Sequence, residues 1–149
     1  MRIAYYEDKF FDSCAHLLME HYNNEFCKCN FTEEKAQYYI SELIQNPRFV
    51  GFLLLDDDDN LIGAALCHER TWWYKDELYI DEFLIISEQQ RIGFGSRLLT
   101  FMQKHSKKRD LAGITLITNN LAMADFYQKN EFHNHDICFM YKGFEHISS

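Results

Sequence analysis

The residues that could do chemistry gather in the middle of the chain. Two adjacent carboxylates, Asp81 and Glu82, interrupt an apolar and aromatic run from Glu77 to Ile86 that predicts a central strand. Carboxylates in such a run are unusual, and a positioned carboxylate can take a proton from a substrate. The segment Gln90 to Gly95 follows this strand and leads into a predicted helix. Glycines and a helix start allow backbone N–H groups to approach a phosphate, so we interpret Gln90 to Gly95 as a phosphate cradle.

This cradle lacks the parts of two well-known nucleotide motifs. The lysine and hydroxyl residue of a P-loop are missing, and Leu98 stands where a dinucleotide-binding motif would place its third glycine. ATP and NAD are therefore disfavoured as ligands.

The segment Gln90-Arg91-Ile92-Gly93-Phe94-Gly95 after a hydrophobic strand resembles the first motif of the GNAT N-acetyltransferases. Downstream, Asn120 lies seven residues before Tyr127, and the run that begins at Tyr127 is similar to the second motif of that family. Glu131 departs from the family pattern, which usually has glycine there, and this leaves the local turn geometry open. The resemblance is most specific from about Tyr79 to Phe132, and among relatives it points to polyamine and aminoglycoside 6'-type acetyltransferases.

The resemblance implies an acetyl-CoA-dependent N-acetyltransferase that acts on a primary amine by direct transfer in a ternary complex, with no metal. Only about one amine in 2,500 is unprotonated at pH 7, so the reaction needs a proton acceptor. Asp81 or Glu82 would supply it, and the resemblance favours Asp81. Because successive strand residues point to opposite faces, we expect only one of the two to face the acceptor. Tyr127 is implied as the general acid that protonates the departing CoA thiolate.

The resemblance also implies how acetyl-CoA is held. Backbone N–H groups near the end of the acidic strand would contact the thioester and pantetheine arm, and those of the cradle would contact the pyrophosphate. The residues implied for acetyl-CoA binding are Leu84, Ile85, Gln90, Arg91, Ile92, Gly93, Phe94, Gly95, Ser96 and Asn120.

The spacing of apolar residues predicts the elements that position these groups. The predicted fold class is α/β, with a GNAT-like mixed, mostly antiparallel central sheet and helices on both faces, in a single domain over residues 1–149. One helix is expected to begin after Thr32 as N-cap and to end before Pro47. Strands are predicted over 2–6, 49–55, 61–68, 77–86, 113–118 and 137–144, and the other helices over 10–22, 92–109 and 122–129.

Composition and charge narrow the function classes. The chain has 149 residues, with 15 Lys and Arg against 23 Asp and Glu, a net charge of −8. This balance argues against binding to nucleic acid or to an anionic membrane, and it favours a cationic small molecule as partner. The longest apolar run, 49–55, is too short to span a bilayer, and the charged N-terminal segment does not resemble a signal peptide, so we expect a cytoplasmic protein. The five cysteines form no metal or redox motif.

Two other functions fit the same residues. One is a non-catalytic acyl-CoA-binding module, and the other is acetylation of a protein N-terminus or lysine. Trp72, Trp73 and Tyr74 either hold a cationic amine or pack on the core or in a dimer interface, since homodimers are frequent in the family. The sequence leaves the acceptor, the acyl chain length and the oligomeric state open.

Overall fold

The computed structural model of the chain describes residues 1–24, 29–86, 92–118, 121–135 and 138–145. These residues fall into two compact parts, Met1–Ile117 and Thr118–Ser149, each described by itself. The elements in chain order are β1 (Arg2–Tyr5), η1 (Asp8–Phe10), α1 (Phe11–Tyr22), α2 (Glu33–Ile44), β2 (Phe49–Leu55), β3 (Leu61–Arg70), β4 (Glu77–Ile85), α3 (Phe94–Lys108), β5 (Ile114–Thr115) and α4 (Leu121–Lys129).

The five strands form one sheet in the order β1-β2-β3-β4-β5. The first four strands pair antiparallel, and β5 pairs parallel to β4. A parallel pair needs a crossover, which α3 provides between β4 and β5. The predicted α/β class with a mixed, mostly antiparallel sheet is therefore confirmed.

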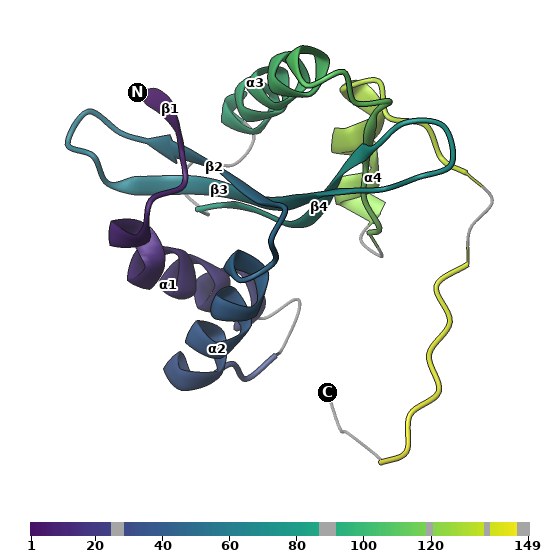
Figure 1. Cartoon of the computed structure of the whole chain (residues 1–149). Coiled ribbons are helices and arrows are strands. Elements are labelled where there is room, and N and C mark those ends of the chain that lie inside the picture. Colours follow the sequence, from purple (N-terminus) through teal and green to yellow (C-terminus); the bar gives the residue numbers. More distant parts are fainter. Residues whose placement is uncertain (25–28, 87–91, 119–120, 136–137, 146–149) are drawn as a thin grey trace. The chain divides into compact units, whose positions relative to one another are not determined.

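Helices cover both faces of this sheet (Figure 1). On one face, α1 and α2 bury a core with alternate residues of the strands, among them Leu53, Leu66 and Leu84. Thr32 caps α2 as predicted, because its side chain accepts a hydrogen bond from the Lys35 N–H at 3.1 Å. Much of this face of the sheet is therefore buried beneath α1 and α2.

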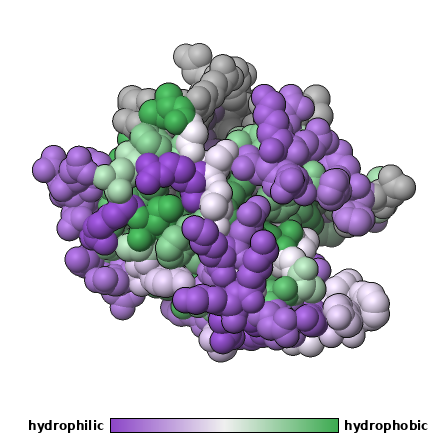
Figure 2. All heavy atoms as spheres, turned by 90° about the horizontal axis from the view of Figure 1, so that it is seen from above, coloured by the Kyte–Doolittle hydropathy of each residue, from purple (hydrophilic) through white to green (hydrophobic). Residues whose placement is uncertain are grey.

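The opposite face of the sheet is covered by α3. Its buried side is apolar and includes Leu98, Leu99 and Met102, while its outer side carries polar and charged residues such as Arg97 and Lys104. Seen from above, where α3 lies in Figure 1, hydrophilic side chains occupy much of the surface (Figure 2). This amphipathic pattern explains why the sequence predicted the helix.

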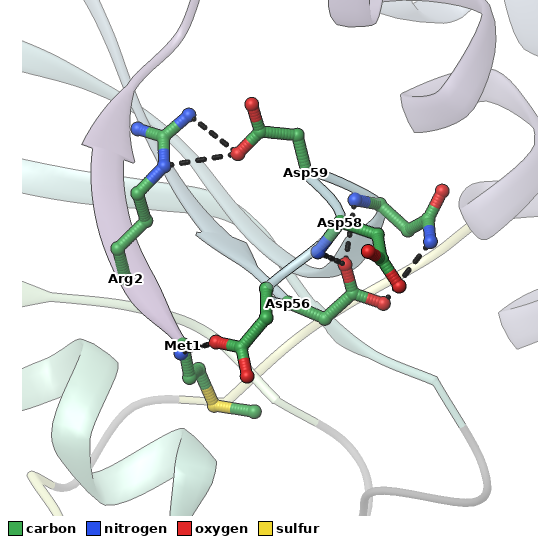
Figure 3. Close-up of polar contacts among 7 residues, drawn as sticks. Met1, Arg2, Asp56, Asp58 and Asp59 are labelled. Carbon is green, nitrogen blue, oxygen red and sulfur yellow. Dashed lines mark hydrogen bonds and ion pairs between the residues drawn. The ribbon is translucent and has the colours of Figure 1, made fainter.

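The hairpin between β2 and β3 is closed by aspartates that serve the turn itself. Asp56 accepts backbone hydrogen bonds from Asp58 at 2.9 Å and Asn60 at 2.8 Å (Figure 3). Arg2 donates to Asp59 at 2.8 Å. Residues 56–60 thus form the turn that joins β2 and β3.

Two predictions about the elements need correction. The strand predicted over 137–144 does not form in the described residues 138–145, because a strand needs a partner for its backbone groups and no ladder pairs this segment. The fifth strand is also shorter than predicted, since pairing with β4 includes only Ile114 and Thr115. None of the helices among the described residues is long and apolar enough to cross a membrane.

Candidate active site

A β-bulge in β4 sets the direction of the two acidic residues. Leu66 of β3 pairs with Glu82, but the next residue, Cys67, pairs with Ile80, so Asp81 is the extra residue. The bulge reverses the alternation along β4. Glu82 thus lies on the face of Leu66, which packs in the core beneath α1 and α2. Bulges commonly redirect side chains beside functional sites.

Asp81 lies on the same face as Glu82. Its carboxylate is 2.6 Å from Nδ1 of His68, which lies two residues after Leu66 on β3 and therefore shares its face. The expectation that strand alternation would send the two carboxylates to opposite faces is wrong, because that rule holds only in a strand without a bulge. Two negative charges thus stand side by side on the face covered by α1 and α2.

Glu82 is buried and held by two tyrosines. Tyr22 of α1 donates its hydroxyl to Oε2 at 2.8 Å, and Tyr39 of α2 donates to Oε1 at 2.7 Å. Phe31 lies between the rings of Tyr22 and Tyr39, with centroid distances of 5.7 and 6.3 Å. Burial raises the pKa of the Glu82 carboxyl, the tyrosine hydrogen bonds oppose this, and the charge of Asp81 adds to it. A carboxylate in such a setting attracts a cation strongly.

The side chains of His68 and Asp81 are more accessible than that of Glu82. They are 23% and 21% exposed. The rings of Tyr79 and His68 pack with their centroids 5.4 Å apart. The Arg70 guanidinium lies 5.0 Å from the centroid of the Tyr79 ring. Burial and then the charge of Asp81 raise the pKa of Tyr79, so its hydroxyl stays protonated near neutral pH.

The described part of the predicted cradle, Ile92 to Gly95, leads into the start of α3 and is followed by Ser96. Gly93 is the N-cap residue and has a φ of 88°, a left-handed conformation that glycine adopts without strain. No side chain caps the helix, and a Cβ at Gly93 would meet nothing within 4 Å. The first backbone N–H groups of α3 therefore follow a glycine that has open space beside it. Gln90, Arg91 and Asn120, also predicted to bind acetyl-CoA, lie outside the described residues.

Leu84 and Ile85 lie at the end of β4 and pair with Ala64 and Gly63 of β3. On its other side β4 pairs with β5 only at Leu78 and Tyr79. The β4–β5 ladder thus ends well before Leu84.

Tyr127 belongs to the part 118–149 and lies on α4. Its ring is 6% exposed and packs between Phe126 and Phe132, with centroids at 5.2 and 5.4 Å. The α4 helix ends in a left-handed turn at Glu131, whose φ is 69°. Phe132 N–H donates to the Tyr127 carbonyl and Glu131 N–H to that of Gln128. Glu131 thus makes the turn that glycine usually makes, at a cost of about 1 kcal/mol.

Sequence reasoning missed Tyr22, Tyr39 and His68 as site residues. The spacing of Tyr22 and Tyr39 places them on the apolar faces of their helices, and both residues pack against the core there. The signal was present: a tyrosine on a buried face needs a partner for its hydroxyl, and a carboxylate in a buried strand needs donors. The aromatic run after β3 is exposed, and its rings contact cations of the same chain, with Arg70 5.1 Å from Trp72 and Lys75 5.6 Å from Tyr74.

Comparison with known proteins identifies the family. A profile described as Acetyltransferase (GNAT) family matches residues 11–132. The chain belongs to the GNAT acetyltransferase family. No curated protein sequence matches it significantly.

Solved structures of other GNAT-like proteins share this fold at low sequence identity. A possible acetyltransferase from Clostridium difficile 630 superposes with a TM-score of 0.79 at 13% identity, covering 97% of this chain and 98% of that one. A GNAT family acetyltransferase from Staphylococcus aureus gives 0.72 at 19% identity, covering 95% and 99%. The aminoglycoside N-acetyltransferase AAC(6')-Iy, solved in complex with CoA, gives 0.76 at 12% identity, covering 95% and 93%.

Proposed function

We propose that this GNAT chain is an acetyl-CoA-dependent N-acetyltransferase that acetylates a primary amine of a small cationic molecule by direct transfer in a ternary complex. The observation that carries the choice of acceptor is the bulge in β4, which places Asp81 and Glu82 on one face. The similarity to AAC(6')-Iy, named an aminoglycoside N-acetyltransferase, supports a small amine. The proposal places the reaction in the cytoplasm, and a homodimer remains compatible with it.

The acidic face supplies what an ammonium group needs. Glu82 is buried among aromatic rings, where its attraction for a cation is stronger than in water. Tyr22 and Phe31 add ring faces, which favour a cation through their quadrupoles. The net charge of −8 acts in the same direction over a longer range. A cationic acceptor is therefore drawn to the sheet face beneath α1 and α2.

The residues that would hold acetyl-CoA fit an anionic, extended substrate. The uncapped start of α3 at Gly93 offers N–H donors and the positive end of the helix dipole for the pyrophosphate. The end of β4 at Leu84 and Ile85, beyond its pairing with β5, offers an edge for the pantetheine arm. In the sequence, Gln90, Arg91, Ile92, Phe94, Gly95, Ser96 and Asn120 complete this proposed set.

The proposed reaction needs two proton movements. A proton acceptor on the sheet face that carries Asp81 and Glu82 removes a proton from the ammonium, and the freed nitrogen lone pair forms the C–N bond with the thioester carbonyl carbon. The C–S bond breaks, its electron pair leaves on sulfur, the hydroxyl of Tyr127 protonates the thiolate, and the second proton from the nitrogen restores that hydroxyl. Tyr127 suits this role because it lies on an ordered helix end within the second GNAT motif.

Thermal unfolding with and without acetyl-CoA tests the proposed binding. With acetyl-CoA at about 100 times its Kd, we expect stabilisation by roughly 2.7 kcal/mol, or about 5 to 10 °C in Tm. ATP and NAD at the same concentration serve as controls and should leave Tm unchanged. An unchanged Tm at millimolar acetyl-CoA contradicts the proposal.

A further inference from the structure

Resting on the proposed function, we infer that His68 is the group that takes the proton from the acceptor ammonium, and that Asp81 acts as a positioning residue for His68. The observation behind this is the contact between His68 Nδ1 and the Asp81 carboxylate at 2.6 Å. This contact assigns the proton-accepting atom to His68 of β3, a residue that the sequence patterns did not single out.

The contact decides which ring nitrogen can accept a proton. An ionised carboxylate only accepts hydrogen bonds, so Nδ1 of His68 carries the hydrogen in that contact. In a neutral imidazole the other nitrogen, Nε2, is then the acceptor. The pairing with Asp81 thus fixes the tautomer that a general base requires.

Nε2 of His68 is open to a substrate. Among the described residues it has no hydrogen-bond partner, and it is not one of the buried polar atoms that lack a partner. His105 is a useful contrast, because its Nδ1 is 2.9 Å from the Tyr5 hydroxyl and its Nε2 is buried without a partner. The ring of His105, a residue of α3, is thus closed off from solvent at Nε2, whereas His68 is partly exposed on the side of the acidic residues.

The surroundings hold the imidazole in place beside the buried carboxylate. His68 lies two residues along β3 from the partner of Glu82, about 7 Å along the strand. Tyr79 packs against one side of the ring. Among the described residues, the titratable and charged side chains on this face or packed against it include Arg70 of β3, Glu77, Tyr79, Asp81 and Glu82 of β4, Tyr22 and its ring neighbour His21 of α1, and Tyr39 of α2.

An imidazole suits the proton transfer better than a carboxylate does. A general base works best when its affinity for protons is matched to the operating pH, and imidazoles in general titrate near neutral pH whereas carboxyls titrate near pH 4. The ammonium loses two protons in becoming an amide. One passes to His68 Nε2 and on to solvent, and the other ends on the CoA sulfur as the C–S bond breaks. The carboxylate of Asp81 accepts a hydrogen bond from the imidazolium formed and stabilises it.

The pH dependence of a His68→Gln variant tests this inference. We measure kcat/KM from pH 6 to 9.5 with acetyl-CoA and spermidine, or with sisomicin if spermidine is not acetylated. At pH 7 the variant should be about 100-fold slower than the natural chain. Without its base the variant depends on the amine that is already unprotonated, and this fraction grows about 100-fold between pH 7 and pH 9. The deficit should therefore shrink at least tenfold by pH 9.

Controls separate this role from a structural one. His16→Gln makes the same change at an exposed residue of α1 and should keep the natural rate at every pH. Asp81→Asn keeps His68 but removes the carboxylate that orients it, so kcat/KM at pH 7 should fall about tenfold, less than in His68→Gln. A His68→Gln deficit equal at all pH values, a His68→Gln loss below threefold at pH 7, or a loss in Asp81→Asn larger than that in His68→Gln overturns the inference. If the natural chain acetylates no amine, the proposed function itself fails, which is a distinct result.

Discussion

A Glu82→Gln variant is expected to unfold at a higher temperature than the natural chain and to acetylate amines about 100-fold more slowly. Glutamine keeps the size of the side chain and an oxygen that can accept from Tyr22 or Tyr39, but it removes the buried charge. Desolvation of that charge costs stability, so losing it raises Tm by about 2 to 4 °C, or about 1 kcal/mol. Losing the charge also removes the attraction for the substrate ammonium, worth about 2.7 kcal/mol for a desolvated pair.

The pH dependence of this stabilisation has a definite sign. Burial raises the pKa of Glu82 in the folded chain, so the folded state binds its proton more tightly than the unfolded state does. The contribution of Glu82 to stability is then fully present below its unfolded pKa near 4.5 and is lost as pH rises through the folded value. The Tm advantage of Glu82→Gln should therefore be near zero at about pH 4 and grow toward pH 8.

A second variant at the same position checks the structural side of this account. Glu82→Ala leaves the hydroxyls of Tyr22 and Tyr39 without their acceptor, so it should lower the free energy of unfolding by about 2 to 4 kcal/mol. Opposite Tm changes for the glutamine and alanine variants, with activity reduced in both, are the expected pattern. Full activity in Glu82→Gln would show that the charge does not serve the reaction.

A Tyr127→Phe variant is expected to lose at least 100-fold in kcat while its affinity for acetyl-CoA stays within about twofold. The ring packing of Tyr127 against Phe126 and Phe132 is kept by phenylalanine, so the fold of α4 is preserved. Only the hydroxyl that protonates the CoA thiolate is lost, and a positioned acid of this kind contributes about 100-fold or more. Turnover is measured by thiol release and affinity by the shift in Tm with acetyl-CoA.

The matched control replaces a tyrosine outside the proposed machinery. Tyr38 of α2 is 65% exposed, so Tyr38→Phe should leave both readings unchanged. An unchanged kcat in Tyr127→Phe would remove Tyr127 from the mechanism and leave it a packing residue at the end of α4.

Hydrophobic spacing predicted most of the fold because each strand and helix buries one face. The strand over 49–55 was predicted with its observed bounds, and Thr32 was predicted as N-cap from its residue type and the acidic first turn after it. The segment 137–144 was predicted wrongly, because β-prone residues form a strand only when another strand supplies hydrogen bonds. That pairing is a tertiary property that local spacing does not contain.

The candidate site was predicted less completely, and the bulge explains why. The residue types identified Asp81 and Glu82, but their common face depends on one extra residue in β4, which no local pattern marks. His68 was missed for the same reason, since its contact with Asp81 exists only through strand pairing. The phosphate cradle was interpreted from glycine and helix chemistry alone and stays a prediction, while the structure shows Gly93 in a left-handed conformation at the start of α3.

Acetyl transfer itself is the most direct test of the proposed function. The purified chain is incubated with acetyl-CoA and, in separate reactions, with spermidine, sisomicin, free lysine and a peptide with a free N-terminus. The masses of the products are measured by mass spectrometry. The account predicts that a small polyamine or aminoglycoside gains one acetyl group (about 42 Da), with one CoA thiol released per product. Acetyl-CoA binding without any acetylated amine would contradict it and favour a non-catalytic acyl-CoA-binding module, and transfer to the peptide alone would contradict the small-molecule acceptor.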